Sequence, residues 1–296
     1  MTAGATGNQN ELQRYYGGAL PACGGPCLWT QSVQLDGDDQ NTHFNAMQVT
    51  LAQQMWRGLA FTANYQWANA FDEGSQYATW SKRVAYGRDG SVRQNSFTAY
   101  GSYDLPFGKG KMFMQSASRA EELLVGGFEL SGTVNVSSGL PFTPKINCQF
   151  SYIDGTGAMQ TASDLPGSAP CYPNKSSTGA RMKTGLTTFN AASQNRTFFA
   201  AQTLGPIFTD AGLDNIGNDG RNTYWGPSFY NMDLSVQKTF AIWEKVGIKA
   251  RADAFNAVNH INAGLPQSNV LSAGTITGEA PGPGPRYLEL SIKATF

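Results

Sequence analysis

The feature that most constrains the fold is an alternation of apolar and polar residues that returns many times along the chain. From Leu59 to Trp67, every second residue is apolar, and the residues between them are polar or small. A β-strand places alternate residues on one face, whereas a helix would spread them around its surface. The same pattern predicts six more strands, at 47–52, 97–105, 128–137, 230–240, 246–254 and 288–296. A weaker candidate for an eighth strand lies at 29–35.

The length of these segments and the composition of the chain indicate strands that cross a membrane. Each segment is about ten residues long, which is what a tilted strand needs to span a bilayer. Charged residues make up only 14% of the chain, against roughly 25% in soluble domains, and aromatic residues make up 12%. No stretch approaches the ~18 consecutive apolar residues of a membrane helix, but barrel strands do not need one. We therefore predict an all-β fold, an antiparallel transmembrane β-barrel.

The connections between the predicted strands alternate between long and short. The links at 53–58 and 241–245 are short, whereas those at 71–92, 139–227 and 259–285 are long. Outer-membrane barrels have long extracellular loops and short periplasmic turns, so the long links are predicted to lie outside the cell. The link at 106–127 has an intermediate length, and its segment 117–124 could form one or two helical turns.

A soluble β-sandwich is the alternative that also explains alternating strands, because one face of each of its sheets is buried and the other is wet. Its turns are usually short at both ends, however. A connection as long as 139–227 is unusual in a compact domain. The loop asymmetry therefore favours the membrane barrel, and the sandwich stays open as a binding module.

The residues offer no catalytic centre, so we expect that the protein is not an enzyme and carries no cofactor or metal. The chain has two histidines, His43 and His260, and neither has a neighbour at a spacing typical of metal ligands. No nucleophile elbow and no metalloprotease motif is present. The formal net charge is zero, which argues against nucleic acid as a partner, since that normally requires a basic face.

The four cysteines are predicted to form disulfides. Cys23, Cys27, Cys148 and Cys171 all lie in regions interpreted as loop or N-terminal extension. In an oxidising periplasm two loop disulfides are simpler than a metal site, which needs a tighter cluster. The pairs Cys23–Cys27 and Cys148–Cys171 are one possibility, because four cysteines allow three connectivities.

The C-terminal segment is the short motif that carries most information. The last strand presents one apolar face and stops on an aromatic residue. Outer-membrane proteins as a class present such a terminal strand to the barrel-assembly machinery. We interpret the apolar face of this strand as that insertion signal, and its residues are Leu288, Leu290, Ile292, Ala294 and Phe296.

Several segments resemble the C-terminal barrel of TonB-dependent receptors. The similarity is to the Oar-like group that bears a carboxypeptidase-regulatory-like domain and is common in Acidobacteria. The segments follow one another in the order NAMQVTL at 45–51, GLAFTANYQW at 58–67, SYDLPFGKGK at 102–111, GGFELSG at 126–132, SGLPFT at 138–143, NMDLSVQKTF at 231–240 and RADAFNAVNH at 251–260. Together they cover most of the chain from about residue 28.

The resemblance implies a larger barrel of about 22 antiparallel strands around a plug, of which seven to eight strands are recognisable here. Residues 1–7 have neither the basic nor the apolar region of a secretory signal peptide. We therefore expect a fragment, with residues 1–27 as an N-terminal loop or extension and 28–296 as a partial barrel. A self-contained eight-strand barrel that serves as an adhesin or a structural anchor is the alternative.

The resemblance also implies partners. They are the outer-membrane lipid, the barrel-assembly machinery, an unknown extracellular ligand, and the TonB complex, which would act through a plug region not recognisable in this chain. The complete parent protein would import its ligand with energy from TonB. Aromatic residues in the longest loop are the predicted ligand contacts, namely Tyr152, Tyr172 and Tyr224.

Overall fold

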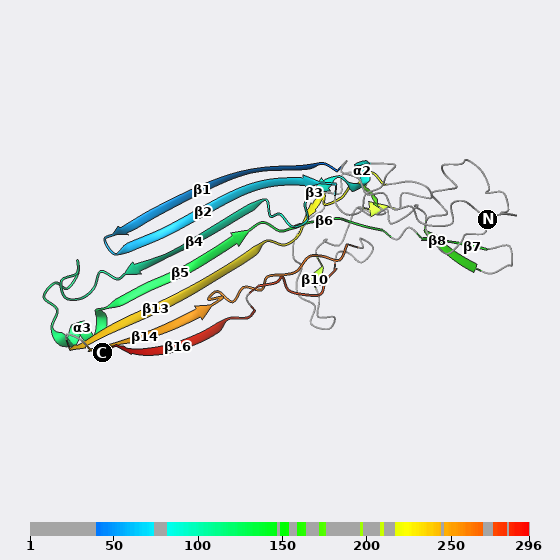
Figure 1. Ribbon diagram of the computed structural model, residues 1–296. Coiled ribbons are helices and arrows are strands. Elements are labelled where there is room, and N and C mark those ends of the chain that lie inside the picture. The colour runs from blue at the N-terminus through cyan, green and yellow to red at the C-terminus, as the bar shows by residue number, and fades with distance from the viewer. Residues whose placement is uncertain are drawn as a thin grey trace.

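Seven long strands form one antiparallel sheet. The computed structural model describes residues 40–73, 82–146, 149–153, 159–163, 172–175, 196–197, 208–209, 217–243, 246–268, 275–282 and 284–295. The strand order in the sheet is β1-β2-β4-β5-β13-β14-β16, so neighbours in space follow one another along the chain (Figure 1). The strands are β1 (Thr42–Trp56), β2 (Leu59–Asp72), β4 (Asn95–Asp104), β5 (Phe128–Ser137), β13 (Phe229–Trp243), β14 (Val246–Phe255) and β16 (Tyr287–Thr295).

These seven strands are the seven that the alternation predicts, and the predicted all-β class is confirmed. The main differences are that β1 runs over Thr42–Trp56, beyond the predicted 47–52 at both ends, and that β2 continues to Asp72 and so enters the segment 71–92, which is predicted to be a loop. The two extensions pair with each other, from Thr42 opposite Asp72 to Ala46 opposite Ala68, and a short strand, β3 (Gly87–Arg88), pairs with Phe71 and Asp72 on the other side. This pairing extends the sheet towards the long connections.

The register of the strands places their alternating apolar rows on one face, although Phe44 of β1 and Phe255 of β14 lie on the other. Leu59 of β2 lies opposite Trp56 of β1 and Tyr103 of β4. Leu234 of β13 lies opposite Ala254 of β14 in the same way. Since a slip of one residue would turn every side chain to the other face, this shared register fixes one apolar and one polar surface.

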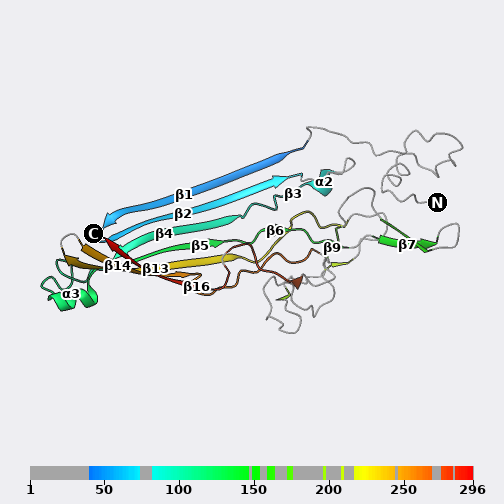
Figure 2. The same cartoon turned by 60° about the horizontal axis from the view of Figure 1, so that its bottom comes forward.

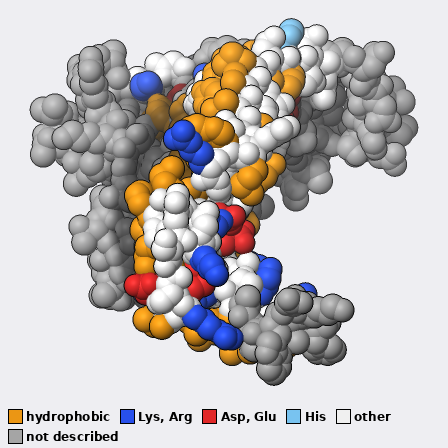
Figure 3. Space-filling view, turned by 90° about the vertical axis from the view of Figure 1, so that its left-hand side faces the viewer, with side chains coloured by type: hydrophobic (Ala, Val, Ile, Leu, Met, Phe, Trp, Pro, Cys, Tyr) orange, Lys and Arg blue, Asp and Glu red, His pale blue; other side chains and the backbone are white. Residues whose placement is uncertain are grey.

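The sheet is strongly curved and open. Figure 2 shows the strands as the wall of a trough, and Figure 3, which looks along them from the short-turn end, shows an arc. Among the described residues, the edge strands β1 and β16 do not pair with each other. Six successive antiparallel pairings separate them, so β1 and β16 run in the same direction.

The short connections lie together at one end of the sheet. Arg57 and Gly58 join β1 to β2 with φ angles of 51° and 87°, which is the pattern of the hairpin turn that suits twisted strands. The link from β4 to β5 contains the predicted helical turns as α3 (Arg119–Val125). Ser118 accepts a hydrogen bond from the Glu121 amide, and the Glu121 carboxylate accepts one from the Ser118 amide, so a capping box starts this helix.

The long connections lie at the opposite end, where they form short paired segments. These are β6 (Pro141–Phe142) with β12 (Tyr224–Trp225), β9 (Asn174–Lys175) with β11 (Phe208–Thr209), β7 (Gln149–Ile153) with β8 (Met159–Ser163), and β10 (Arg196–Thr197) with β15 (Thr275–Ile276). A second short helix, α2 (Lys82–Ala85), precedes β3. Neither helix of the described chain is long and apolar enough to span a membrane.

Candidate membrane surface and loop cluster

The convex face of the sheet is an apolar surface exposed around the outside of the arc. Apolar side chains gather along the outer border of the arc in Figure 3. They are far more exposed than residues of a soluble protein core: Leu51 is 61% exposed, and Leu290 and Ile292 are 82% and 80% exposed. A continuous apolar surface of this kind marks a site of contact with lipid or protein.

Aromatic residues lie at both ends of this apolar face, with aliphatic ones between them. On β13 the face runs from Tyr230 through Leu234 and Val236 to Phe240. The ten steps from Tyr230 to Phe240, at ~3.4 Å each, span ~34 Å along the strand, or ~26 Å along the membrane normal at a tilt of ~40°. This agrees with the apolar band of ~25 Å between aromatic girdles that outer-membrane barrels present to lipid.

Lys238 is the one cation in the convex row of β13, and its environment explains how it is accommodated. Its Nζ donates a hydrogen bond of 2.6 Å to the carbonyl oxygen of Gly126. The same Nζ lies 4.1 Å from the centre of the Phe128 ring and 5.1 Å from that of Phe240. The cation therefore sits at the aromatic end of the band, where a long side chain can reach the headgroup level.

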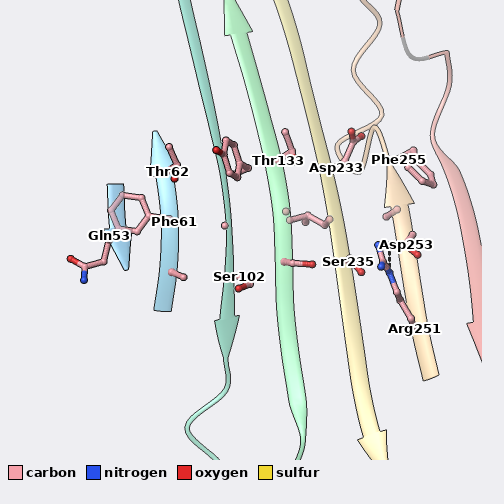
Figure 4. Close-up of a pocket in the computed structure, with 17 residues that line it drawn as sticks. Gln53, Phe61, Thr62, Ser102, Thr133, Asp233, Ser235, Arg251, Asp253 and Phe255 are labelled. Atoms are coloured by element: carbon pink, nitrogen blue, oxygen red, sulfur yellow. Dashed lines mark hydrogen bonds and ion pairs between the residues drawn. The ribbon is translucent and has the colours of Figure 1, made fainter. Parts of the chain in front are cut away.

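The concave face of the sheet is polar and hydrogen-bonded. Thr50 donates to Asn64 over 2.8 Å, and Thr98 donates to Asn135 over 2.9 Å, in both cases between neighbouring strands. The sheet curves around a hollow of about 560 Å³ on this side (Figure 4). Such a face is typical of the inner wall of a barrel, where side chains meet water or polar ligands.

The charges of the concave face gather on one half of the sheet. Arg251 and Asp253 of β14 form an ion pair of 2.7 Å, drawn in Figure 4. Gln237 donates to Glu129 over 3.0 Å between β13 and β5. By contrast, the inward residues in the middle of β1, β2 and β4 are uncharged, being Gln48, Thr50, Thr62, Asn64, Gln66, Ser96, Thr98, Tyr100 and Ser102.

Most of the described hydrophobic core lies among the long connections, and Ala68 and Ala70 at the adjoining end of β2 complete it. Tyr224 is 8% exposed, and its ring centre lies 5.7 Å from that of Phe208 and 6.1 Å from that of Phe142. Val84 and Ala85 of α2 are almost fully buried. We call this set the loop cluster, and its residues are Val84, Ala85, Phe142, Tyr172, Phe208, Asp219, Arg221, Asn222 and Tyr224.

Arg221 joins the loop cluster to the end of the sheet. Its guanidinium pairs with the Asp72 carboxylate and donates to the Asp72 carbonyl oxygen over 2.8 Å. It also donates to the carbonyl oxygen of Ala85 over 3.2 Å. Next to it, the Asn222 side chain donates to the carbonyl oxygen of Arg88 and accepts from the Thr143 hydroxyl. Three segments distant in sequence therefore meet at this point.

Three asparagines fix the connection between β14 and β16 at the same end. Asn256 is 1% exposed, and its side chain donates to the carbonyl oxygens of His260 and Gly284. Asn262 exchanges two hydrogen bonds with the backbone of Tyr230. Asn256 and Asn259 adopt positive φ angles of 47° and 52°, a conformation that asparagine tolerates better than most residues. Two of these asparagines, at 256 and 259, belong to the motif at 251–260 that carries the family resemblance.

The predicted ligand-loop tyrosines occupy different environments. Tyr172 is 2% exposed, and its hydroxyl donates to the carbonyl oxygen of Val84. Burial raises the pKa of Tyr172 to about 12. Burial also raises the pKa of Tyr224, and the nearby Asp219 carboxylate adds to this effect. Both rings therefore pack inside the loop cluster, whereas the Tyr152 side chain lies outside the described residues. Contact of the three with a ligand stays a prediction.

The other residues predicted to have a role are only partly described. Cys23, Cys27, Cys148 and Cys171 all lie outside the described residues, and so does Phe296. The four other members of the proposed insertion signal lie on the convex face of the edge strand β16. Within the described chain, no group of three His, Cys, Asp or Glu side chains is placed to hold a metal ion.

Comparison with known families decides between the interpretations of the convex face. The family model for the outer membrane beta barrel domain matches residues 1–289. This chain belongs to that family. The outer membrane beta barrel assignment confirms the predicted all-β barrel fold and places the protein in the outer membrane of Gram-negative bacteria. No curated protein and no solved structure matches the chain.

Membership of the outer membrane beta barrel family gives each surface a physical meaning. The exposed apolar face contacts lipid, and the polar concave face belongs to the inside of the wall. Arg221 and Asn222 were not identified by the sequence analysis. Both lie in the segment Asp-Gly-Arg-Asn, whose composition is typical of an ordinary turn. No periodic signal marks them, because their partners are distant in sequence.

Proposed function

We propose that this chain forms part of the wall and the extracellular rim of a TonB-dependent receptor, which binds an external ligand and imports it. In this proposal the protein binds and transports and does not catalyse a reaction. The observation that carries it is the loop cluster, a packed unit held over the long-loop end of a polar inner wall. Ordered loops of this kind suit ligand recognition, since a rigid scaffold lowers the entropy cost of binding.

The polar concave face supports a role in passage. Its middle is lined by neutral hydroxyl and amide groups on one half and by paired charges on the other. Such a wall can exchange hydrogen bonds with a polar ligand or with a plug segment of the parent protein. Siderophores, saccharides and peptides all fit this chemistry. The TonB complex would engage through the plug region of the parent protein.

A self-contained barrel that serves as an adhesin or anchor is the second candidate, and strand direction bears on it. β1 and β16 run the same way, so an antiparallel closure needs an odd number of further strands. One further strand would complete the eight-strand barrel, the smallest common size. Its lumen would be filled by side chains and would pass no large ligand.

Crosslinking to TonB in intact cells tests the proposal without knowledge of the ligand. An epitope inserted at Gly278 would serve for capture, since a side chain at that residue would meet no atom within 4 Å of its Cβ. We expect formaldehyde to link the polypeptide that carries this chain to TonB, and the link to disappear in cells lacking TonB. If a known TonB-dependent receptor is captured from the same cells and this protein is not, the anchor is the better interpretation.

A further inference from the structure

A groove opens at the short-turn end of the sheet, between the β1–β2 turn and the connection from β4 to β5. Its volume is about 670 Å³. Trp56, Leu59 and Tyr103 line it, and all three belong to the apolar rows of the convex face. Met112 and Phe113 of the connection form the other wall. The groove is therefore continuous with the lipid-facing surface.

The connection that borders the groove exposes many large apolar side chains. Met112 is 58% exposed, Phe113 is 50% exposed and Leu124 of α3 is 74% exposed. Exposure of these apolar side chains to water is unfavourable, so this arrangement suits an apolar environment. Lys238 of the convex face donates a hydrogen bond to the carbonyl oxygen of Gly126, which keeps the end of α3 next to that face. The connection therefore lies at the boundary between headgroups and acyl chains.

Two cations stand at the groove. The Arg57 guanidinium lies 4.7 Å above the Trp56 ring. Lys111 lies 3.7 Å from the Asp104 carboxylate, and both of these side chains are nearly half exposed, so the pair is weak. Arg57 also has a φ of 51°. Asparagine or glycine would fit this turn position better, so an arginine here has a cost that the turn itself does not explain.

We propose that this groove is a binding site for a phospholipid of the leaflet that the short turns reach. The phosphate lies between Arg57 and Lys111, and an acyl chain runs along Trp56, Leu59 and Phe113. An anionic headgroup pairs with both cations, while the apolar walls cover the upper part of the acyl chain and keep it out of the headgroup region. Free phosphate would use the cations and leave the apolar walls uncovered. The inference rests on the outer-membrane position of the sheet and does not depend on transport.

Photolabelling tests this site. The parent polypeptide, purified from outer membranes, is reconstituted into phosphatidylcholine vesicles that contain a small fraction of phosphatidylglycerol with a diazirine in its acyl chain. After irradiation, labelled peptides are mapped by mass spectrometry. We expect strong labelling of the segments around residues 56–59 and 103–113. General labelling of β16, whose Leu290 and Ile292 face lipid, serves as the internal reference.

The variant with Arg57→Asn and Lys111→Gln should lose this labelling. Each basic residue near an anionic lipid surface changes binding by roughly fivefold, so the loss of both should reduce labelling by about thirtyfold. The matched control carries Arg286→Asn and Lys109→Gln, neither of which lines the groove. This control should be labelled as strongly as the unsubstituted protein.

The proposal would be overturned by unchanged labelling of the groove variant, by equal losses in the control, or by displacement of the label by inorganic phosphate alone. Labelling of the groove no stronger than that of β16 would have the same meaning. If the double variant does not insert, Arg57→Asn alone decides the matter, because asparagine suits the turn better and the expected loss is still about fivefold. A failure of the TonB crosslinking experiment would not affect the labelling result, because the lipid site does not depend on transport.

Discussion

A lysine placed in the middle of the convex face should destabilise the protein by an amount that depends on depth. On β13, Tyr230 and Phe240 mark the two ends of the apolar band, so its midpoint falls near residue 235. Leu234 is therefore within ~3 Å of the bilayer midplane. A lysine at that depth costs ~2–4 kcal/mol, which lowers the folding equilibrium constant by roughly thirtyfold to a thousandfold.

The measurement is a urea titration of the protein in phospholipid vesicles, followed by tryptophan fluorescence, with Leu234→Lys compared with Leu234→Ala. The alanine variant subtracts the loss of the leucine side chain, so the difference reports the charge. Phe240→Lys, at the end of the band, should cost only ~0–1 kcal/mol. Thr133→Lys provides the control on the concave face, because Thr133 lies opposite Asp233 and a lysine there gains a carboxylate partner.

Equal costs for Leu234→Lys and Thr133→Lys would refute the assignment of the convex face to lipid. A cost for Phe240→Lys as large as that for Leu234→Lys would refute the depth scale instead. The two results are separable, because the first compares faces at one height and the second compares heights on one face.

Three further predictions concern the loop cluster and the sheet. The pKa of Tyr172 is raised to about 12 from an ordinary 10, so the stability that its neutral hydroxyl contributes is complete below pH 10 and is lost as the pH rises towards 12. Proteolysis of the loops should therefore increase between pH 10 and pH 12. The increase should be smaller in Tyr172→Phe, which has no hydroxyl to ionise. Arg221→Gln should destabilise the loop cluster by about 2 kcal/mol, since it leaves the partly buried Asp72 without its cation, and limited trypsin digestion would then cut 139–227 sooner. Gly101→Ala should destabilise the sheet by ~1–3 kcal/mol, because a Cβ there would lie 2.6 Å from the Ala60 carbonyl oxygen, whereas Gly278→Ala, with open space, should change the urea midpoint little.

The sheet was predictable from the sequence because each of its strands carries its own signal. Alternation over about ten residues fixes the strand and its two faces, and short turns fix which strands are neighbours. The segment 128–137 predicted from alternation is β5 itself. The pattern is weaker where small residues replace large ones, and the predicted end of β2 fell short of Asp72, where Ala68 and Ala70 give little contrast.

The loop cluster could not be predicted in the same way, because its contacts join residues far apart along the chain. Arg221 and Asp72 are separated by 149 positions, and Tyr172 and Val84 by 88. No repeating pattern marks such partners, and Asn, Asp and Gly in these segments also fit ordinary turns. The aromatic residues of the longest loop are the predicted ligand contacts. Their burial in the structure makes two of them part of the packing that holds the loops.

The distribution of buried and exposed residues shows how the two ends of the molecule are stabilised. The described buried apolar residues, from Ala68 and Val84 to Ile276, all lie towards the long-loop end, while large apolar residues such as Leu290 are exposed along the sheet. The sheet therefore depends on lipid for the apolar contacts that a soluble protein obtains from its core, whereas the loop cluster supplies its own. Substitutions in the sheet should consequently change stability with membrane composition, and substitutions in the loop cluster should change it in the same way in any bilayer or detergent.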